Sequence, residues 1–405
     1  MDSFKKLNIR SYTWLNGTSN LSWVYVMERL GIAFEELGHN FYPVSTNGLG
    51  NSCFGEEKIL KSTIALQDFG PGKEKIDIDL TYTIMANLPK RFLTNSKYKC
   101  CIYNYETQWW PKDWKKYYGL ADFYFPSSNF SAEIFHLNGI LKEKIFVIPH
   151  GIDTKVFNPN IPPIKINTEK KYKFVSVCAP HFRKNIDILL EAFCEAFTKQ
   201  DDVCLVLKTK VFKHSDGIYD EIKNPKGRKG FEIVIGDIFK KLKDKHGDRI
   251  PEIVLLNGHV DNVASIYNAC NTHITTTGAE GWCLPILESM ASGLLNICPN
   301  YSGHLDFANV DNSLLINTHL APAKQTEQYW GYNPKSTIGR PDKQHLTELM
   351  YKAVKEHNTL LEKFKPNMYK TVKELSWTSA AQKIIDATEG KLDHYKPKTY
   401  NWWPK

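Results

Sequence analysis

Short apolar runs alternate with longer amphipathic stretches along most of the 405-residue chain. The first apolar run, 7–14 (LNIRSYTW), predicts a strand, and 21–37 has the periodicity of a helix that ends at Gly38. Between them lies a polar loop with Gly17 at its centre. A strand, a glycine-bearing loop and a long helix predict a Rossmann-like opening, although the loop lacks the GxGxxG pattern of a dinucleotide site.

The alternation continues to about residue 150, gives way to a stretch rich in proline, lysine and asparagine, and resumes with 172–177 (YKFVSV). Such a break in composition is typical of a linker between domains. We therefore predict an α/β protein with two Rossmann-like domains. The predicted parts are an N-terminal domain (1–158), a C-terminal domain (159–385) and a tail (386–405) that packs back on the N-terminal domain, with helices at 344–357 and 373–387.

The stretch 275–300 (TTTGAEGWCLPILESMASGLLNICPN) combines regular elements with candidate chemistry. The β-branched residues of 271–277 predict a strand, and 294–299 (LLNICP) predicts another. Pro285 suits the first residue of a helix between them, and Gly293 suits its end. The predicted unit is therefore a strand, a loop, a helix and a second strand.

Two glutamates of this unit, Glu280 and Glu288, are separated by seven residues. The prediction places Glu280 in the loop and Glu288 in the first turn of the helix. A helix start offers free N–H groups that suit a phosphate, and carboxylates accept hydrogen bonds from sugar hydroxyls. Two surface acids on an ordinary β/α element are the alternative for this motif taken alone.

Basic residues follow other predicted strands of the C-terminal domain. Arg183 and Lys184 follow the first strand, Lys208 ends the second, and the loop 257–260 follows the third. Because the carboxyl ends of parallel strands meet at one edge of a sheet, we expect these groups to converge with Glu280. Three cations, a helix N-terminus and two carboxylates suit a nucleotide diphosphate-sugar, whereas each cation taken singly could be a solvated surface residue.

At these positions the sequence resembles the GT-B glycosyltransferases, specifically the retaining family 4 type. The resemblance spans roughly residues 120–310, and the first hundred residues match only in layout. The matching segments are Val147-Ile-Pro-His-Gly-Ile-Asp153 with Phe157 and Pro159, Arg183-Lys184 before 186–193, Asn257-Gly-His-Val260 with Ile266-Tyr267, Glu280-Gly-Trp-Cys-Leu-Pro-Ile-Leu-Glu288 with Met290-Ala-Ser-Gly293, and Ser302-Gly303.

The resemblance implies the GT-B fold, in which two Rossmann-like domains face each other across a cleft. The N-terminal domain would lie on the acceptor side, and the C-terminal domain would bind the nucleotide-sugar. The implied reaction is retaining transfer of a hexose or related sugar from a UDP- or GDP-sugar to an acceptor hydroxyl, with no cofactor and no metal. The leaving diphosphate would help to deprotonate the acceptor on the same face of the sugar.

Family roles carry over to the matching positions of this chain. Glu280 would hold the transferred sugar, Glu288 would bind the ribose, and Lys184 with Lys208 would neutralise the diphosphate. The remaining implied positions are Arg183 beside the diphosphate, the backbone of Gly281, Trp282, Cys283 and Leu284 against the diphosphate or sugar, His259 and Val260 beside the base, and Gly17 close to the donor.

Three positions depart from the family pattern. Cys178-Ala179 stands where the family usually has Gly-Arg, so one diphosphate cation is missing or replaced by Arg183. Cys283 stands where glycine is common. Glu106 follows a first-domain strand where many members have a histidine, and it is the candidate substitute. The missing Gly-Arg pair motivates a second hypothesis, a GT-B protein that binds nucleotide-sugar with weak catalysis. A sugar-nucleotide epimerase with the GT-B fold is a third.

Composition and charge set the remaining expectations. The net charge of +8 is compatible with an anionic ligand, a membrane surface or nucleic acid, and identifies none of them. No apolar run has the length of a signal-peptide core or a membrane span. The nine cysteines follow no ligand spacing, so we expect reduced thiols and a cytoplasmic location, with peripheral membrane association left open.

Two further patterns have structural alternatives. Asp77 and Asp79 form a DxD triplet, which can hold a metal bound to a diphosphate or simply alternate along a strand. Trp109, Trp110 and Trp114 can stack on sugars or bases, or pack in a core. The acceptor stays open among a glycan, a lipid-linked sugar, a small molecule, a protein and nucleic acid.

Overall fold

The computed structural model of the protein describes residues 5–13, 22–45, 75–83, 85, 88, 96–209, 235–257, 260, 262–324, 327 and 333–397. The chain forms two compact units, one from residues 1–151 together with 375–405 and the other from 152–374. Each unit contains a parallel β-sheet with helices packed against it. The predicted α/β class with two Rossmann-like domains is confirmed.

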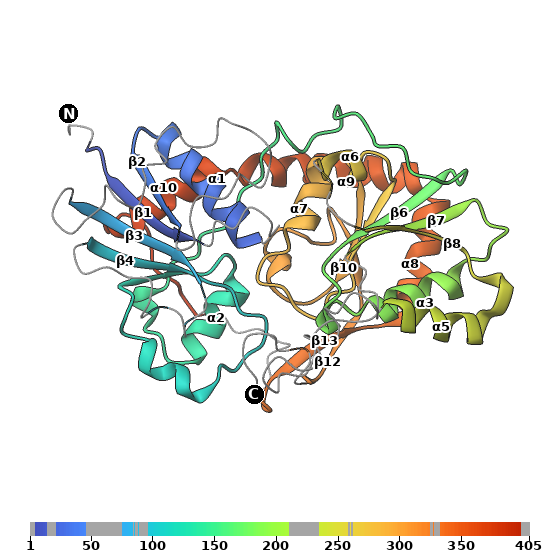
Figure 1. The fold of residues 1–405 in the computed structure, drawn as a ribbon, viewed down its shortest axis with the longest axis horizontal. Helices are drawn as coiled ribbons and strands as arrows, with labels where there is room; N and C mark the ends of the chain where they lie inside the picture. Colours follow the sequence, from blue (N-terminus) through green and yellow to red (C-terminus); the bar gives the residue numbers. More distant parts are fainter. Residues whose placement is uncertain are drawn as a thin grey trace. The chain divides into compact units, whose positions relative to one another are not determined.

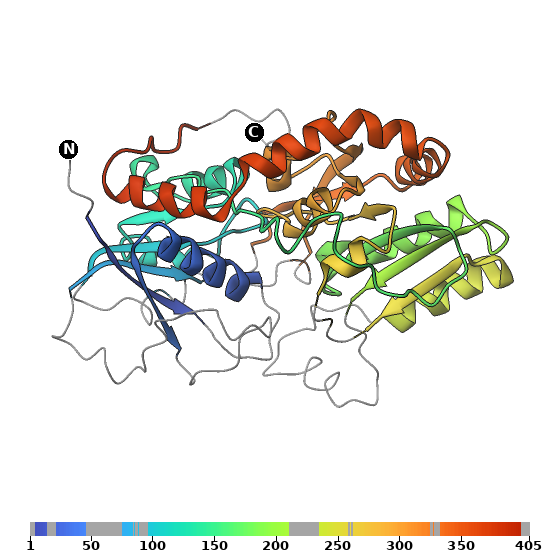
Figure 2. The ribbon, with the colours of Figure 1, turned by 90° about the horizontal axis from the view of Figure 1, so that it is seen from above.

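The first unit is built on a five-stranded parallel sheet with the order β2-β1-β3-β4-β5. Figure 1 shows α1 and α10 on one face of this sheet and α2 on the other. The helix α10, red in Figure 2, lies beside the blue α1. The elements are β1 (Asn8–Thr13), α1 (Ser22–Glu36), β2 (Asn40–Ser45), β3 (Ile76–Tyr82), β4 (Ser96–Ile102), η3 (Lys112–Tyr117), β5 (Phe123–Phe125), α2 (Asn129–Leu137), η4 (Lys142–Lys144) and α10 (Trp377–Thr388).

The DxD triplet and the tryptophan cluster both have structural roles in this unit. Asp79 accepts two hydrogen bonds from the buried Arg10 guanidinium, at 2.6 and 2.8 Å, and Asp77 accepts one from the backbone N–H of Asn8. These contacts tie β3 to β1. Trp110 and Trp114 are buried in an aromatic cluster with Tyr103, Tyr105 and Phe135, so these two rings pack in the core.

Gly151, the last residue before the chain enters the second unit, lies against the start of α10. A Cβ at this position would lie 2.2 Å from the backbone nitrogen of Trp377. We therefore expect Gly151→Ala to destabilise the protein by about 3 kcal/mol, because backbone atoms cannot move aside as a side chain can. Gly119→Ala is the matched control, since no atom of the residues that the structure describes lies within 4 Å of a Cβ there. Urea unfolding followed by tryptophan fluorescence checks the difference, and equal midpoints for the two variants would contradict it.

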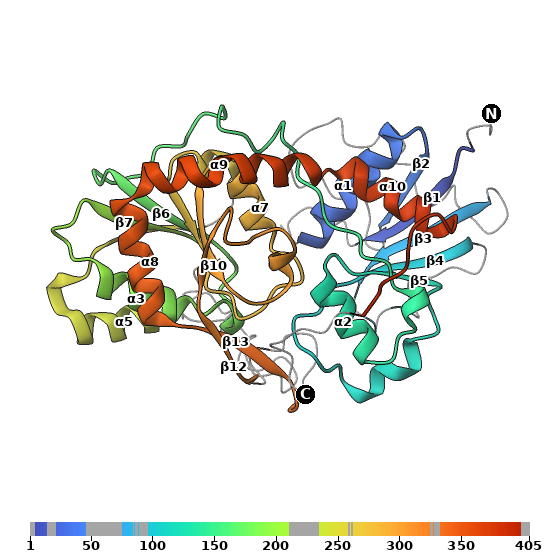
Figure 3. The ribbon, with the colours of Figure 1, turned by 180° about the vertical axis from the view of Figure 1, so that it is seen from behind.

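The second unit is built on a six-stranded parallel sheet with the order β11-β10-β9-β6-β7-β8. Figure 3 shows α8 beside α3, while α7 packs against α9. The elements are β6 (Tyr172–Val177), η5 (Phe182–Lys184), α3 (Ile186–Ala196), β7 (Val203–Lys208), α5 (Ile235–His246), η6 (Gly247–Arg249), β8 (Glu252–Leu256), α6 (Ala264–Tyr267), β9 (Thr272–Ile274), α7 (Leu284–Ala291), β10 (Leu295–Pro299), η7 (Gly303–Asp306), β11 (Leu314–Ile316), β12 (Thr318–Pro322), β13 (Thr337–Pro341), α8 (Lys343–Lys355) and α9 (His357–Glu374).

Some elements differ from what the sequence patterns predict. The short apolar run 145–149 predicts a strand, but it forms a single bridge, Tyr124 with Ile145, since Pro126 has no N–H to extend the ladder. The predicted helix 373–387 is divided, because α9 ends at Glu374 and Ser376 caps the start of α10. Among the described helices, none combines the length and the apolar character that a membrane crossing needs.

The order of strands in the second sheet defines where a ligand site is expected. From β6 the chain moves outward to β7 and β8, and it then returns to the other side of β6 as β9. The loops after β6 and β9 therefore lie side by side at the carboxyl edge of the sheet, where the direction of the connections reverses. In open parallel sheets this switch point is where ligands bind.

Candidate active site

Glu280 lies in the loop after β9, at this switch point, and is only 8% exposed. Its backbone is held from both sides. The N–H of Glu280 donates to the Ser302 hydroxyl at 2.9 Å, and its carbonyl accepts the N–H of Gly303 at 2.9 Å. The loop that follows β10 thus fixes the position of the glutamate.

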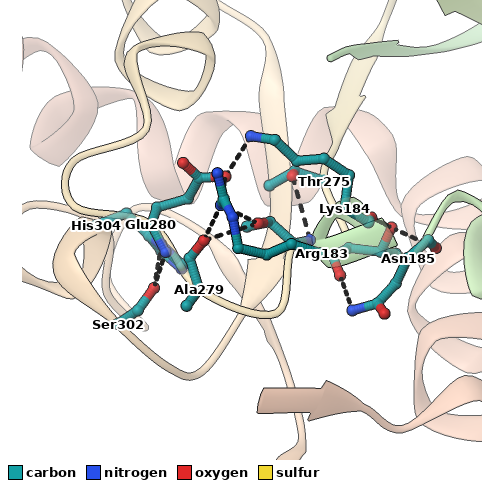
Figure 4. Close-up of polar contacts among 10 residues, drawn as sticks. Arg183, Lys184, Asn185, Thr275, Ala279, Glu280, Ser302 and His304 are labelled. Carbon is teal, nitrogen blue, oxygen red and sulfur yellow. Dashed lines mark hydrogen bonds and ion pairs between the residues drawn. The ribbon is translucent and has the colours of Figure 1, made fainter. Parts of the chain in front are cut away.

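Two cations from the loop after β6 contact the Glu280 carboxylate (Figure 4). The Lys184 amino group donates to Oε1, and Nη1 of Arg183 lies 3.1 Å from the same oxygen. Arg183 also donates to the carbonyl of Ala279. Burial by itself would raise the pKa of Glu280, but the charges of Lys184 and Arg183 lower that pKa to about 2. The carboxylate is therefore ionised at neutral pH although it is buried.

Asn185 connects the two loops just behind this ion pair. It adopts left-handed backbone geometry, with φ of 47°, immediately before α3. Its side-chain amide donates to the carbonyl of Thr276 at 3.0 Å, and the Thr276 hydroxyl donates to the carbonyl of Lys184 at 2.9 Å. Asparagine tolerates this backbone region better than most residues. The loops after β6 and β9 are therefore bonded to each other directly beside Glu280.

Backbone strain is concentrated around this glutamate. Among the described residues, the non-glycine residues with positive φ are Asn185, Cys283 (φ 74°) and Ser302 (φ 88°). Asn185 and Ser302 bond to the segments that hold Glu280, and Cys283 follows it by three residues. Ser302, with ψ of −167°, occupies a region used almost entirely by glycine. Strained residues of this kind persist where the surrounding structure holds them, and they cluster at functional sites.

A chain of hydrogen bonds that the sequence patterns did not predict connects the backbone of Glu280 to a buried histidine. The Nε2 atom of His304 lies 2.8 Å from the carbonyl of Pro299, which can only accept, so Nε2 carries the proton. Nδ1 is then free to accept from the Ser302 hydroxyl at 3.3 Å, and that hydroxyl accepts the N–H of Glu280. The Ser302-Gly303 pair was the available signal, since it belongs to the family resemblance, whereas nothing in the pattern pointed to His304.

The second glutamate has a different environment. Glu288 is the fifth residue of α7, so it lies in the second turn and the expectation of the first turn was wrong. The hydroxyl of the buried Tyr267 donates to Oε2 of Glu288 at 2.9 Å. Burial raises the pKa of Glu288 to about 7, and the Tyr267 hydrogen bond offsets only part of that rise. Two glutamates with seven residues between them are thus held with opposite pKa shifts, which is a pattern typical of functional carboxylates.

The helix α7 begins directly after Cys283, with Pro285 in its first turn. The side chain of Cys283 does not cap the helix; Pro285 has no N–H, and the N–H of Ile286 donates to the Cys283 carbonyl at 3.2 Å, so what this helix start offers a ligand is mainly the positive end of the helix dipole. The left-handed geometry of Cys283 explains why glycine would suit this position. Trp282 is buried against Phe307, with ring centroids 4.7 Å apart, and Gly281 is buried as well, so only their backbone is suited to a ligand.

The remaining candidate residues lie as follows. Lys208 ends β7, its carbonyl accepts the N–H of Cys178 at 3.1 Å, and burial lowers the pKa of its half-buried amino group. Val260 is half-buried after β8, and Glu106 is half-buried in the first unit after β4. Gly17 and His259 lie outside the described residues. Within the described segments, no three His, Cys, Asp or Glu side chains gather as a metal site would require.

Comparison with proteins of known structure identifies the fold of the chain. No family model and no curated protein matches the sequence. A glycosyltransferase from Rickettsia africae ESF-5 is similar in structure, with a TM-score of 0.65, 15% identity and coverage of 96% of this chain and 99% of that one. HepE of Anabaena, solved with UDP and glucose, has a TM-score of 0.65, 11% identity and coverage of 95% and 100%. Sucrose-phosphate synthase from Thermosynechococcus elongatus has a TM-score of 0.62, 13% identity and coverage of 95% and 99%. The chain therefore has the GT-B fold of these glycosyltransferases, with two Rossmann-like α/β domains.

Proposed function

We propose that this protein is a retaining glycosyltransferase of the family 4 type, which moves a hexose or related sugar from a nucleotide diphosphate-sugar to an acceptor hydroxyl. The observation that carries the proposal is the buried Glu280 carboxylate, held by Lys184 and Arg183 at the switch point of the sheet. A carboxylate beside two cations and an uncapped helix start suits a ligand with both sugar hydroxyls and a diphosphate.

In the proposed reaction the bond between the anomeric carbon and a diphosphate oxygen breaks. A bond to the acceptor oxygen forms on the same face of the sugar, and the acceptor proton passes to the diphosphate. Negative charge grows on the leaving group, where Lys184, Lys208 and the positive end of the α7 dipole stabilise it. Because the chain itself supplies this positive charge, we propose a metal-independent reaction.

The two glutamates divide the donor between them. Glu280 accepts hydrogen bonds from hydroxyls of the transferred sugar, and Glu288, supported by Tyr267, accepts those of the ribose. Glu106 of the first unit is the proposed polar group on the acceptor side of the sugar. HepE of Anabaena has been solved with UDP-glucose, and this favours UDP as the first nucleotide to test.

A thermal-shift screen of nucleotides and nucleotide-sugars tests the proposal. A ligand present at 100 times its Kd stabilises the folded state by about 2.7 kcal/mol, which raises Tm by several degrees. We expect a UDP- or GDP-sugar to give such a shift, and we expect hydrolysis or transfer of that donor to disappear in Glu280→Gln. If no nucleotide or nucleotide-sugar changes Tm, the proposal is contradicted. Binding without turnover would indicate a catalytically weak protein, and conversion of donor without acceptor, followed by NMR, would indicate an epimerase.

A further inference from the structure

The two cations beside Glu280 are held in different ways. Arg183 is anchored to its own neighbourhood, because it donates to the carbonyl of Ala279 and lies 3.3 Å from the Thr277 hydroxyl. For the Lys184 amino group, the hydrogen-bond partner found within the described residues is the Glu280 carboxylate. Lys184 is therefore the cation that a competing anion can draw away, at the cost of its contact with Glu280.

We expect the Glu280 ion pair to interact differently with the two nucleotide species of the proposed reaction, the free nucleoside diphosphate and the intact nucleotide-sugar. A free nucleoside diphosphate brings negative charge to Lys184 but has no sugar hydroxyl for Glu280. It would leave the buried Glu280 carboxylate, whose side chain is 10% exposed, close to a second anion and deprived of its lysine partner. Buried like charges repel strongly, because little water screens them.

The intact nucleotide-sugar brings the same diphosphate together with hydroxyl donors for that carboxylate. Hydrogen bonds to an ionised group are among the stronger ones, so they offset the lost contact with Lys184. The carboxylate thus favours the intact donor and disfavours the diphosphate that remains after transfer.

We propose that Glu280, besides holding the sugar, acts as a discriminator that lowers the affinity of the site for the free nucleoside diphosphate product. The inference rests on the proposed function, and it adds that the unliganded ion pair of Glu280 with Lys184 and Arg183 promotes product release. It makes Glu280 a specificity-determining residue whose charge and hydrogen-bonding capacity have separate effects.

Isothermal titration with two matched pairs of ligands, UDP with UDP-glucose and GDP with GDP-mannose, tests the inference. For the pair that the wild type binds, we expect Glu280→Gln to bind the free diphosphate about tenfold more tightly, since a buried negative charge has been removed. The same variant loses the charge-assisted bonds to the sugar, so the preference for donor over diphosphate falls by at least about tenfold. Glu280→Asp keeps the charge and is expected to retain weak diphosphate binding.

Glu288→Gln is the matched control, because ribose is common to both ligands of a pair. It is expected to weaken both by a similar factor and to leave the preference unchanged. An unchanged preference in Glu280→Gln, or weaker diphosphate binding in that variant, would overturn the inference while the proposed function stands. A wild type that binds neither member of either pair would overturn the proposed function and the inference together.

Discussion

A Lys184→Met variant is expected to transfer sugar about 100- to 1,000-fold more slowly than the wild type. The methionine keeps the apolar stem of the side chain and removes the charge that contacts Glu280. Removing one preorganised group that stabilises developing negative charge costs about 2.7–4 kcal/mol of transition-state stabilisation in other enzymes. The measurement is the initial rate of donor turnover at saturating nucleotide-sugar.

Lys343→Met is the control for the loss of a paired lysine. Lys343 lies in the same unit at the start of α8 and contacts Glu191 and Glu195 at 3.2 and 2.7 Å, on a more exposed surface. Its replacement is expected to leave turnover within about twofold of wild type, since exposed ion pairs contribute little. Turnover in Lys184→Met within tenfold of wild type would argue against a role for this cation in leaving-group stabilisation.

The second large effect concerns Glu288 and pH. The pKa of this carboxyl is raised by burial from its ordinary value of 4.5 to about 7. The folded protein therefore holds the proton up to about pH 7, whereas the unfolded chain releases it near pH 4.5. Stability must then fall as pH rises from about 4.5 to 7, because over that interval the folded state binds more protons than the unfolded state.

Glu288→Gln removes this penalty and can still accept the Tyr267 hydrogen bond. We expect the variant to be about 1–3 kcal/mol more stable than wild type at pH 8 and similar to it at pH 4.5, as measured by urea unfolding. Glu362→Gln, on the exposed face of α9, serves as the control and should change neither value. A stability difference that does not depend on pH would contradict the raised pKa.

The same titration predicts how donor binding depends on pH. If the ribose hydroxyls bind the ionised form of Glu288, wild-type affinity for the nucleotide should rise as pH increases through about 7 and then level off. Glu288→Gln should show weaker binding without this rise. The combination of greater stability at pH 8 with weaker binding identifies a carboxylate that is maintained for a ligand rather than for the fold.

The alternation of apolar runs and amphipathic stretches was sufficient to predict the α/β class, because strands and helices of parallel sheets leave local periodicities that one sequence retains. The strand, loop, helix and strand of 275–300 appear as β9, α7 and β10, with Pro285 in the first turn of the helix. Local patterns were less informative where proline lies within a helix. Pro366 lies inside α9, a helix that the patterns did not predict.

Such local patterns could not predict which residues far apart in the chain contact each other. The sequence by itself could place Lys184 and Glu280 on the same edge of a sheet, since that follows from parallel strands. Only the tertiary structure decided that β6 and β9 are neighbours, and hence that these side chains meet as an ion pair. The partners of the two glutamates come from different elements: Ser302 and His304 follow β10, whereas Tyr267 ends α6.

The backbone at Cys283 is another feature that the sequence indicated and the tertiary structure explained. The sequence indicated that a cysteine stands where glycine is common, but the reason is a φ of 74° that the fold imposes at the start of α7. What the sequence determined by itself is the order and type of elements and the residues that carry chemistry. The tertiary structure decided which of those residues share a buried site and what charge state burial and neighbouring ions give them, because both effects act through space between residues up to about a hundred positions apart.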